Sequence, residues 1–210
     1  MTAETHPAAA APANLAVKLP WLALAAAGLA ADLWTKHLVF YPHVLEPGFD
    51  ERRGAVVGVV VPRWWQTVLA YNNGVTFGLG AGFGAWVLSG FTALVIVLLV
   101  RALWKTARKE RMRLFALSII VGGAIGNLYD RGVRPYVEAD KHPGVRDFID
   151  WYVPDGNAVA DWLRSHNVTT HWYTFNVADA CIVSGVVILA WKILREKSPD
   201  ETGPAPEASA

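Results

Sequence analysis

FNVADACIVSGVVILAWKIL, residues 175–194, is long and apolar enough to cross a bilayer as a helix, yet it carries an acid, Asp179, close to its start. About 20 apolar residues span the hydrocarbon core. A carboxylate at the centre of such a helix costs about 2.5–3.5 kcal/mol on insertion scales. Because Asp179 lies near one end of the run, we expect it at the membrane interface rather than at the costly midplane.

Three other stretches have spanning length. The run 19–41 contains Asp32 and Lys36, the run 81–100 has no charge, and the run 114–129 is rich in glycine. Trp residues stand near the ends of the runs, where an interfacial aromatic belt would place them: Trp21, Trp86, Trp104 and Trp191. The sequence therefore predicts an α-helical membrane protein with transmembrane helices at about 19–41, 81–103, 113–130 and 175–194.

Composition supports one membrane-embedded domain, 1–210. The chain is 53% apolar and 18% charged, whereas soluble domains average about 25% charged residues. A net charge of +1 argues against a nucleic-acid partner, and a single cysteine, Cys181, excludes an intramolecular disulfide. The first run has an alanine-rich core like that of a signal peptide, but only Lys18 precedes it, so we expect it to be retained.

The loops predict an orientation. The link 101–113 carries six Lys/Arg and one Glu, so the positive-inside rule places it and both termini in the cytoplasm. The long connections 42–80 and 131–174 then face outward. The Ala/Pro-rich tails, 1–18 and 198–210, are expected to be disordered.

The outer connections predict a small β-sheet and a short helix. Residues 54–79 are rich in β-branched and aromatic residues and contain the turn signal NNG. Residues 155–166 fit a short amphipathic helix with Asp155 as its N-cap.

Four acids fall at the outer ends of the predicted helices or just outside them: Asp32, Asp130, Asp147 and Asp179. Each has a structural explanation of its own. Asp32 and Lys36 are spaced as an i,i+4 ion pair, and Asp130 beside Arg131 fits a solvated helix end. Asp147 fits an ordinary loop acid, and Asp179 follows Asn176 as in a helix N-terminal capping box.

The clustering of these four acids at one depth favours a catalytic role over four separate structural roles. Two carboxyl groups that share a proton provide one acid and one base, the arrangement of an aspartic peptidase. The residues by themselves do not decide which acid partners Asp179.

Other chemistries fit less well. Cys181 has no base at a suitable spacing, and His142, His166 and His171 lack metal-ligand spacing. The Gly-rich stretch 74–84 enters a membrane helix and does not fit a phosphate loop. Small residues on the third helix, Gly122, Gly123 and Gly126, predict close helix packing. We expect no metal and no cofactor.

Five motifs in order along the chain resemble those of bacterial lipoprotein signal peptidase, also called signal peptidase II. They are DLWTK at 32–36, NNGVTFGL at 72–79, GGAIGNLYDR at 122–131, RDFID at 146–150 and FNVADA at 175–180. The resemblance implies a four-helix inner-membrane aspartyl protease with a small extracytoplasmic β-cradle. It also implies a substrate, a diacylglyceryl-modified prolipoprotein, which the family cuts just before the lipidated cysteine.

The same resemblance assigns roles to residues. The catalytic pair would be Asp147 and Asp179, and Asp130 would give structural support. The residues that orient substrate and dyad would be Asp32, Lys36, Asn72, Gly126, Asn127, Arg131, Asn176 and Ala178. The loops 132–145 and 151–174 are longer than the family pattern. We expect membrane lipids as neighbours, a monomer, and an active site near the outer face.

Two rival functions remain at this stage. Acids inside a membrane also mark ion pathways, so the first rival is a small proton-coupled transporter or channel. It would need acids spread through the membrane depth, whereas these lie at one level. The second rival is a non-catalytic scaffold, in which Asp179→Asn would be tolerated.

Overall fold

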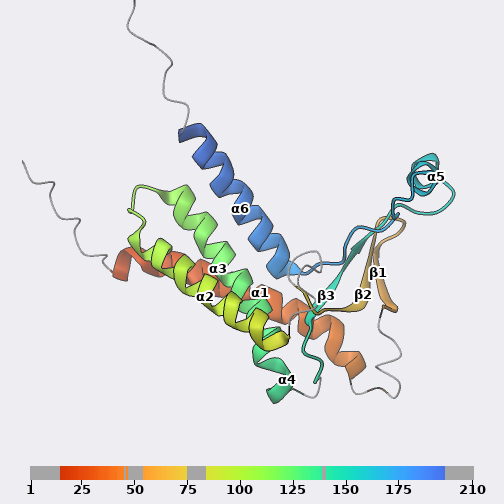
Figure 1. Ribbon diagram of the computed structural model, residues 1–210, viewed down its shortest axis with the longest axis horizontal. Helices are drawn as coiled ribbons and strands as arrows, with labels where there is room; N and C mark the ends of the chain where they lie inside the picture. The colour runs from red at the N-terminus through yellow and green to blue at the C-terminus, as the bar shows by residue number, and fades with distance from the viewer. Residues whose placement is uncertain (1–14, 45, 47–53, 75–83, 139–140, 197–210) are drawn as a thin grey trace, which may run out of the picture.

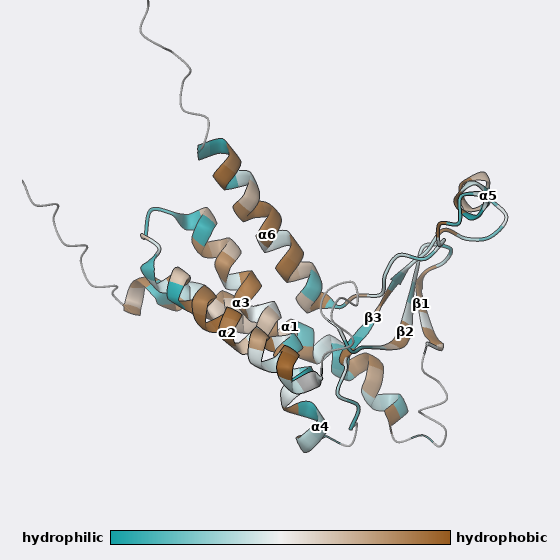
Figure 2. Ribbon diagram, viewed as in Figure 1, coloured by the Kyte–Doolittle hydropathy of each residue, from teal (hydrophilic) through white to brown (hydrophobic). Residues whose placement is uncertain are grey.

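Four long helices form the body of the protein (Figure 1). The computed structural model describes residues 15–44, 46, 54–74, 84–138 and 141–196. The helices are α1 (Leu15–Val44), α2 (Ala85–Lys105), α3 (Arg111–Gly132) and α6 (Val177–Glu196), and all four are long and apolar enough to cross a membrane. Hydrophobic residues cover most of their length, and hydrophilic ones gather at the α2–α3 connection (Figure 2). The predicted four-helix membrane fold with a small sheet is confirmed.

Helix α3 is the centre of the bundle. Of its most apolar segment 61% is buried, against 17% or less in each of the other three spans, and α3 packs on α1, α2 and α6. Its glycines permit this: a Cβ on Gly122 would collide with the backbone of Ala25 on α1, and one on Gly123 would lie 2.5 Å from the carbonyl oxygen of Ala178 on α6. The predicted close helix packing is confirmed.

α1 and α3 extend beyond their predicted bounds at both ends, whereas α2 and α6 begin later than predicted, at Ala85 and Val177. α1 begins at Leu15, so residues 15–18 of the expected tail are helical. The buried Lys18 donates its Nζ to the carbonyl oxygens of Leu103, at 2.9 Å, and Thr106, at 2.5 Å, at the end of α2. Hydropathy cannot reveal such a contact. The remaining tail residues, 1–14 and 197–210, lie outside the described residues.

A three-stranded antiparallel sheet, in the order β1-β2-β3, lies at one end of the bundle. β1 (Val56–Val61) and β2 (Trp65–Asn72) form a hairpin that turns at 62–64, where Arg63 has a φ of 74°. The NNG motif follows β2 instead of making this turn, and residues 75–79 of the predicted β region lie outside the described residues. The third strand, β3 (Val145–Trp151), contains the RDFID motif and was not expected as a strand.

Two short helices complete the chain. α4 (Arg134–Val137) follows α3, and α5 (Ala158–Ser165) lies in the long connection after β3. The prediction of Asp155 as N-cap of α5 was wrong: Asn157 caps it, accepting from the backbone N–H groups of Val159 and Ala160 at 2.9 Å. Between the two residues, Gly156 has a φ of 78° and redirects the chain, and Asp155 pairs with Arg164.

A small apolar core fastens the sheet to the bundle. Phe40, near the end of α1, packs with Leu69 of β2 and with Phe148 and Ile149 of β3. Because Asp147 precedes Phe148 in the strand, this core holds the acid at the end of the helix bundle.

Candidate active site

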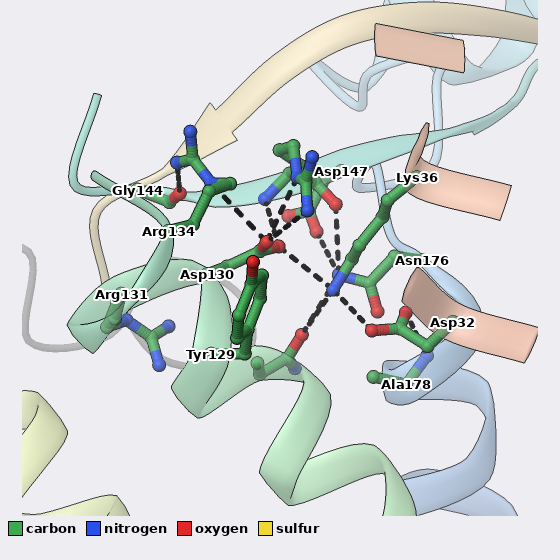
Figure 3. Close-up of polar contacts among 12 residues, drawn as sticks. Asp32, Lys36, Tyr129, Asp130, Arg131, Arg134, Gly144, Asp147, Asn176 and Ala178 are labelled. Atoms are coloured by element: carbon green, nitrogen blue, oxygen red, sulfur yellow. Dashed lines mark hydrogen bonds and ion pairs between the residues drawn. The ribbon is translucent and has the colours of Figure 1, made fainter. Parts of the chain in front are cut away.

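The end of the bundle that carries the sheet gathers the polar residues expected at the site (Figure 3). α1 supplies Asp32 and Lys36, the end of α3 supplies Asn127 and Asp130, β3 supplies Asp147, and the start of α6 supplies Asn176 and Asp179. Since α1 and α3 end where α6 begins, residues far apart in the sequence meet at one depth.

Backbone hydrogen bonds join β3 to the chain entering α6. The carbonyl oxygen of Phe175 accepts from the N–H groups of Phe148 at 3.1 Å and Ile149 at 2.8 Å, and Phe175 returns its own N–H to Ile149 at 3.1 Å. Asp147 and Asp179 are therefore positioned by one continuous piece of backbone pairing.

The start of α6 is a capping box, as its sequence predicted. Asn176 Oδ1 accepts from the N–H of Asp179 at 2.9 Å, and Asp179 Oδ2 accepts from the N–H of Asn176 at 3.3 Å. The other carboxyl oxygen, Oδ1, accepts from Asn127 Nδ2 at 2.9 Å. Three hydrogen bonds thus hold the acid and its neighbouring amide in fixed orientation.

Asn176 also reaches the second acid. Its buried Nδ2 lies 2.6 Å from Asp147 Oδ1, 3.2 Å from Asn127 Oδ1 and 3.2 Å from the carbonyl oxygen of Arg146. One asparagine therefore contacts both Asp147 and Asp179.

The environment of Asp147 favours its protonated form. Burial raises the pKa of this carboxyl from 3.8 to about 8, and the negative charge of Asp179 acts in the same direction. The positive charge of Lys36 and the hydrogen bonds from Asn72 and Asn176 oppose the shift. Since two such groups titrate as a pair, the pair retains a proton at neutral pH.

Asp32 and Asp130 have a different environment because Lys36 lies between them. Lys36 Nζ lies 2.7 Å from Asp32 Oδ2, 3.0 Å from Asp130 Oδ2 and 3.1 Å from Asn127 Oδ1, which occupies all three ammonium donors. The predicted Asp32–Lys36 ion pair is confirmed, and both side chains are fully buried. Asp32 Oδ1 also accepts from the backbone N–H of Ala178 at 2.9 Å.

Gly126 is required for this arrangement. A Cβ at Gly126 would collide with the Asp32 carboxyl group. The absence of a side chain on α3 therefore lets Asp32 lie against it, within reach of Lys36 and Ala178.

The solvated helix end considered for Asp130 is wrong. Asp130 is fully buried, and Arg146 contacts it through its backbone N–H at 3.0 Å, Nε at 3.0 Å and Nη2 at 2.8 Å. Arg134 adds a contact at 3.4 Å. Neither arginine was predicted to belong to the site; the signal for Arg146 was a basic residue directly before Asp147 in the RDFID motif.

Arg131 lies outside this network. Its side chain points away from Asp130 (Figure 3) and donates to the carbonyl oxygen of Gly74. Asn72 ends β2, and its Oδ1 accepts from the N–H of Gly74 at 2.9 Å. Arg131 and Asn72 thus hold the chain just after β2. Each also lines a groove beside the acids.

Two grooves reach the site, and Asp179 lines one of them. One, of about 160 Å³, lies between α2, α3 and α6 and includes Phe91, Ile120 and Ile182 beside Asn127 and Arg131. The other, of about 290 Å³, includes Asp179 itself with Asn72, Trp151, Trp172, Phe175 and Val183. Asp179 is therefore accessible from an apolar groove, whereas Asp147 is buried behind it.

Lysine and arginine side chains form ion pairs with Asp32 and Asp130, and asparagine side chains donate hydrogen bonds to Asp147 and Asp179. Within the ranges that the structure describes, no group of three or more His, Cys, Asp or Glu side chains is arranged to hold a metal ion. A buried carboxyl that holds a proton beside a second carboxylate is suited to general acid–base hydrolysis.

Comparison with known proteins agrees with this chemistry. The family model for signal peptidase (SPase) II matches residues 24–195. A lipoprotein signal peptidase from Azoarcus sp. (strain BH72) is 32% identical over 189 residues, covering 89% of each chain. One from Rhodopirellula baltica (strain DSM 10527 / NCIMB 13988 / SH1) is 36% identical over 171 residues, covering 79% of this chain and 67% of the relative.

The fold has solved counterparts. A bacterial membrane enzyme solved by the in meso method at 2.3 Å resolution aligns with a TM-score of 0.63 and 21% identity, covering 89% of this chain and 94% of that one. A second, at 1.9 Å resolution, aligns with a TM-score of 0.58 at 21% identity, covering 84% and 94%. With a family model that extends from α1 to the end of α6, the chain belongs to the signal peptidase II family.

Proposed function

We propose that this chain removes the signal peptide from diacylglyceryl-modified prolipoproteins, using Asp147 and Asp179 as an acid–base pair. The chain is a multi-pass protein of the bacterial inner membrane, and its family consists of aspartic peptidases that act on prolipoproteins. The observation that carries the catalytic assignment is the contact of Asn176 with both acids, 2.6 Å from Asp147 and 3.3 Å from Asp179.

The reaction needs one proton on the pair. Asp179, as carboxylate, takes a proton from water, and the water oxygen attacks the scissile carbonyl carbon. Asp147, which holds its proton because it is buried, donates that proton to the carbonyl oxygen. When the tetrahedral intermediate collapses, Asp179 delivers its proton to the leaving nitrogen, the C–N bond breaks, and Asp147 recovers a proton from the hydroxyl group.

Asp32, Lys36 and Asp130 act as supports in this mechanism. They fix the position of Asn127 and of the α6 N-terminus through the Lys36–Asn127 and Asp32–Ala178 hydrogen bonds. Remote contacts of this kind keep the reacting groups in place, which contributes to rate by orientation.

The substrate reaches the pair from the bilayer. The groove between α2, α3 and α6 is apolar apart from Asn127, Arg131 and Thr92, and it suits an acyl chain or an apolar signal helix. We expect a monomeric enzyme with membrane lipids around it. The basic α2–α3 connection supports cytoplasmic termini, with the pair at the outer face.

Cleavage of a lipidated precursor tests the proposal. Purified protein in detergent is incubated with a diacylglyceryl-modified prolipoprotein, and release of the signal peptide is followed by gel electrophoresis and mass spectrometry. We expect cleavage by the wild-type protein and by Asp155→Asn, whose carboxyl is 83% exposed in the connection between β3 and α5. Asp147→Asn and Asp179→Asn should give no product, and full activity of either folded variant would refute the assignment.

A further inference from the structure

A further hollow lies at the end of the bundle away from the sheet, between α1, α3 and α6. It has a volume of about 630 Å³, and its apolar walls include Trp21 of α1, Met112 and Phe115 of α3, and Val187 and Trp191 of α6. We call it the basal hollow. Its walls are partly open to the surroundings, since Met112 is 43% exposed, Phe115 40% and Trp191 45%.

The paths of α1 and α6 create the basal hollow. The two helices come close near Gly28, where an added Cβ would lie 3.9 Å from Cys181 Sγ. Toward the α2–α3 connection they separate (Figure 1), while α3 packs on both of them. The start of α3 therefore forms the floor of a gap that opens from three helices of membrane-spanning length.

Two arginines stand at the rim of the basal hollow. Arg111 lines it, and Arg195 follows Trp191 by one helical turn, with its Cζ 4.2 Å from the centroid of the indole ring. Both arginine side chains are exposed. Within the described part of the chain, neither forms an ion pair with a carboxylate. Both positive charges can therefore meet an external anion.

The nearby acids are already paired with other cations. Glu110 Oε2 lies 3.5 Å from Lys192 Nζ and 3.7 Å from Arg113 Nη1, and Glu196 also pairs with Lys192. An anion that approached Arg111 would therefore meet little repulsion from this end of the bundle.

We propose that the basal hollow binds one anionic phospholipid, with an acyl chain between Trp21 and Trp191 and the phosphate at Arg111 and Arg195. The occupant is a lipid because the walls are apolar and open from membrane-spanning helices. It is anionic because the two arginines lack a carboxylate partner, and basic pockets between transmembrane helices recognise anionic headgroups in this way. Trp side chains at the rim suit the headgroup level.

A lipid in the basal hollow would join α1 to α6 where the two helices are apart. Only 11% of the most apolar segment of α6 is buried, so this helix gains a neighbour along an otherwise open face. Because a ligand that binds only the folded state stabilises that state, the anionic lipid should raise the thermal midpoint. The proposal concerns the end of the bundle away from Asp147 and Asp179 and does not depend on their catalytic role.

Native mass spectrometry measures which lipid the protein retains. Purified protein in detergent is mixed with equal amounts of phosphatidylglycerol, which is anionic, and phosphatidylethanolamine of the same acyl chains. We expect wild type to retain phosphatidylglycerol preferentially, and Arg111→Gln and Arg195→Gln each to lower that preference about fivefold. Arg101→Gln is the matched control, because it removes the same charge from an exposed position of α2, which does not line the hollow.

A second pair of variants tests the apolar part of the site. Val187→Trp fills the basal hollow and should abolish retention of phosphatidylglycerol without any change in charge. Val186→Trp is the control, because Val186 is 52% exposed on the same helix but does not line the hollow. Soluble glycerol phosphate in excess should not displace the lipid, since it has no acyl chain.

Three results would overturn the proposal. Equal retention of the two lipids by wild type would exclude an anionic site, and an equal loss in Arg101→Gln would assign the preference to the basic surface as a whole. Displacement by glycerol phosphate would mean an anion site without a lipid chain. Circular dichroism establishes that each variant is folded, and Val187→Phe replaces Val187→Trp if the larger side chain prevents folding. Peptidase activity is not the readout, so failure of the proposed function would leave the result intact.

Discussion

Two pairs of aspartates lie at the same end of the bundle, and their neighbours differ. Asp32 and Asp130 are joined by Lys36, and Asp130 also meets Arg134 and Arg146. Asp147 and Asp179 are contacted by asparagine amides instead. A buried carboxylate paired with cations stays charged and contributes to structure, whereas one held by neutral amides can keep a proton. From these neighbours we infer that the Asp147–Asp179 pair is the one suited to acid–base chemistry.

The largest expected effect concerns activity. Asp179→Asn should lower kcat by about 10²–10⁴-fold, the contribution of a general acid–base group. Its cost in stability should be small, about 1 kcal/mol, because the amide keeps one of the two hydrogen bonds that the carboxylate oxygens accept. Asp32→Asn should instead affect stability more than activity, since Lys36 then loses an ionic partner. Steady-state cleavage and thermal unfolding in the same detergent measure both. If Asp179→Asn and Asp32→Asn lowered activity equally and stability equally, the two pairs would not differ in role.

Removing the positive charge of Lys36 should destabilise the buried pair of Asp32 and Asp130. Lys36→Met leaves two buried carboxylates without their shared partner and should reduce the free energy of unfolding by about 3–5 kcal/mol. Lys109→Met, at an exposed position of the α2–α3 connection, provides the matched control. Thermal unfolding of the two variants side by side checks this, and identical midpoints would show that Lys36 contributes little.

The pH dependence should follow the Asp147–Asp179 pair. With the pKa of Asp147 raised to about 8 by burial, kcat should fall about tenfold per pH unit above pH 8 as the shared proton is lost. Stability should fall as pH rises from about 4 to about 8, because in that range the folded state holds a proton that the unfolded state releases. Asp147→Asn should flatten this part of the stability profile. An unchanged slope in that variant would assign the titration to another group.

The smallest expected effect separates the two roles of Asn176. Asn176→Ala should cost about 1 kcal/mol through loss of the α6 cap and should also lower cleavage, because Asp147 loses its amide donor. Asn176→Ser keeps a capping oxygen but has no amide. It should recover stability without recovering activity. Recovery of both would mean that the Asp147 contact is dispensable.

Local patterns in the sequence predicted the parts of the molecule that are local. Hydropathy over about 20 residues identified the four spans, since bilayer thickness sets helix length. The spacing of Asn176 and Asp179 predicted the capping box, and the spacing of Asp32 and Lys36 predicted their ion pair, because residues three and four apart meet on a helix. The prediction of Asp155 as the N-cap of α5 was wrong because the sequence pattern does not reveal the backbone turn at Gly156.

The sequence by itself determined that this chain crosses the membrane four times and carries its acids at one depth, because hydropathy and helical spacing act over short distances. Only the tertiary structure decided that β3 joins the sheet, that Arg134 and Arg146 surround Asp130, and that Asn176 contacts Asp147 as well as Asp179. These contacts join residues distant along the chain. The protonation and charge of these residues depend on burial and on neighbours that folding brings together.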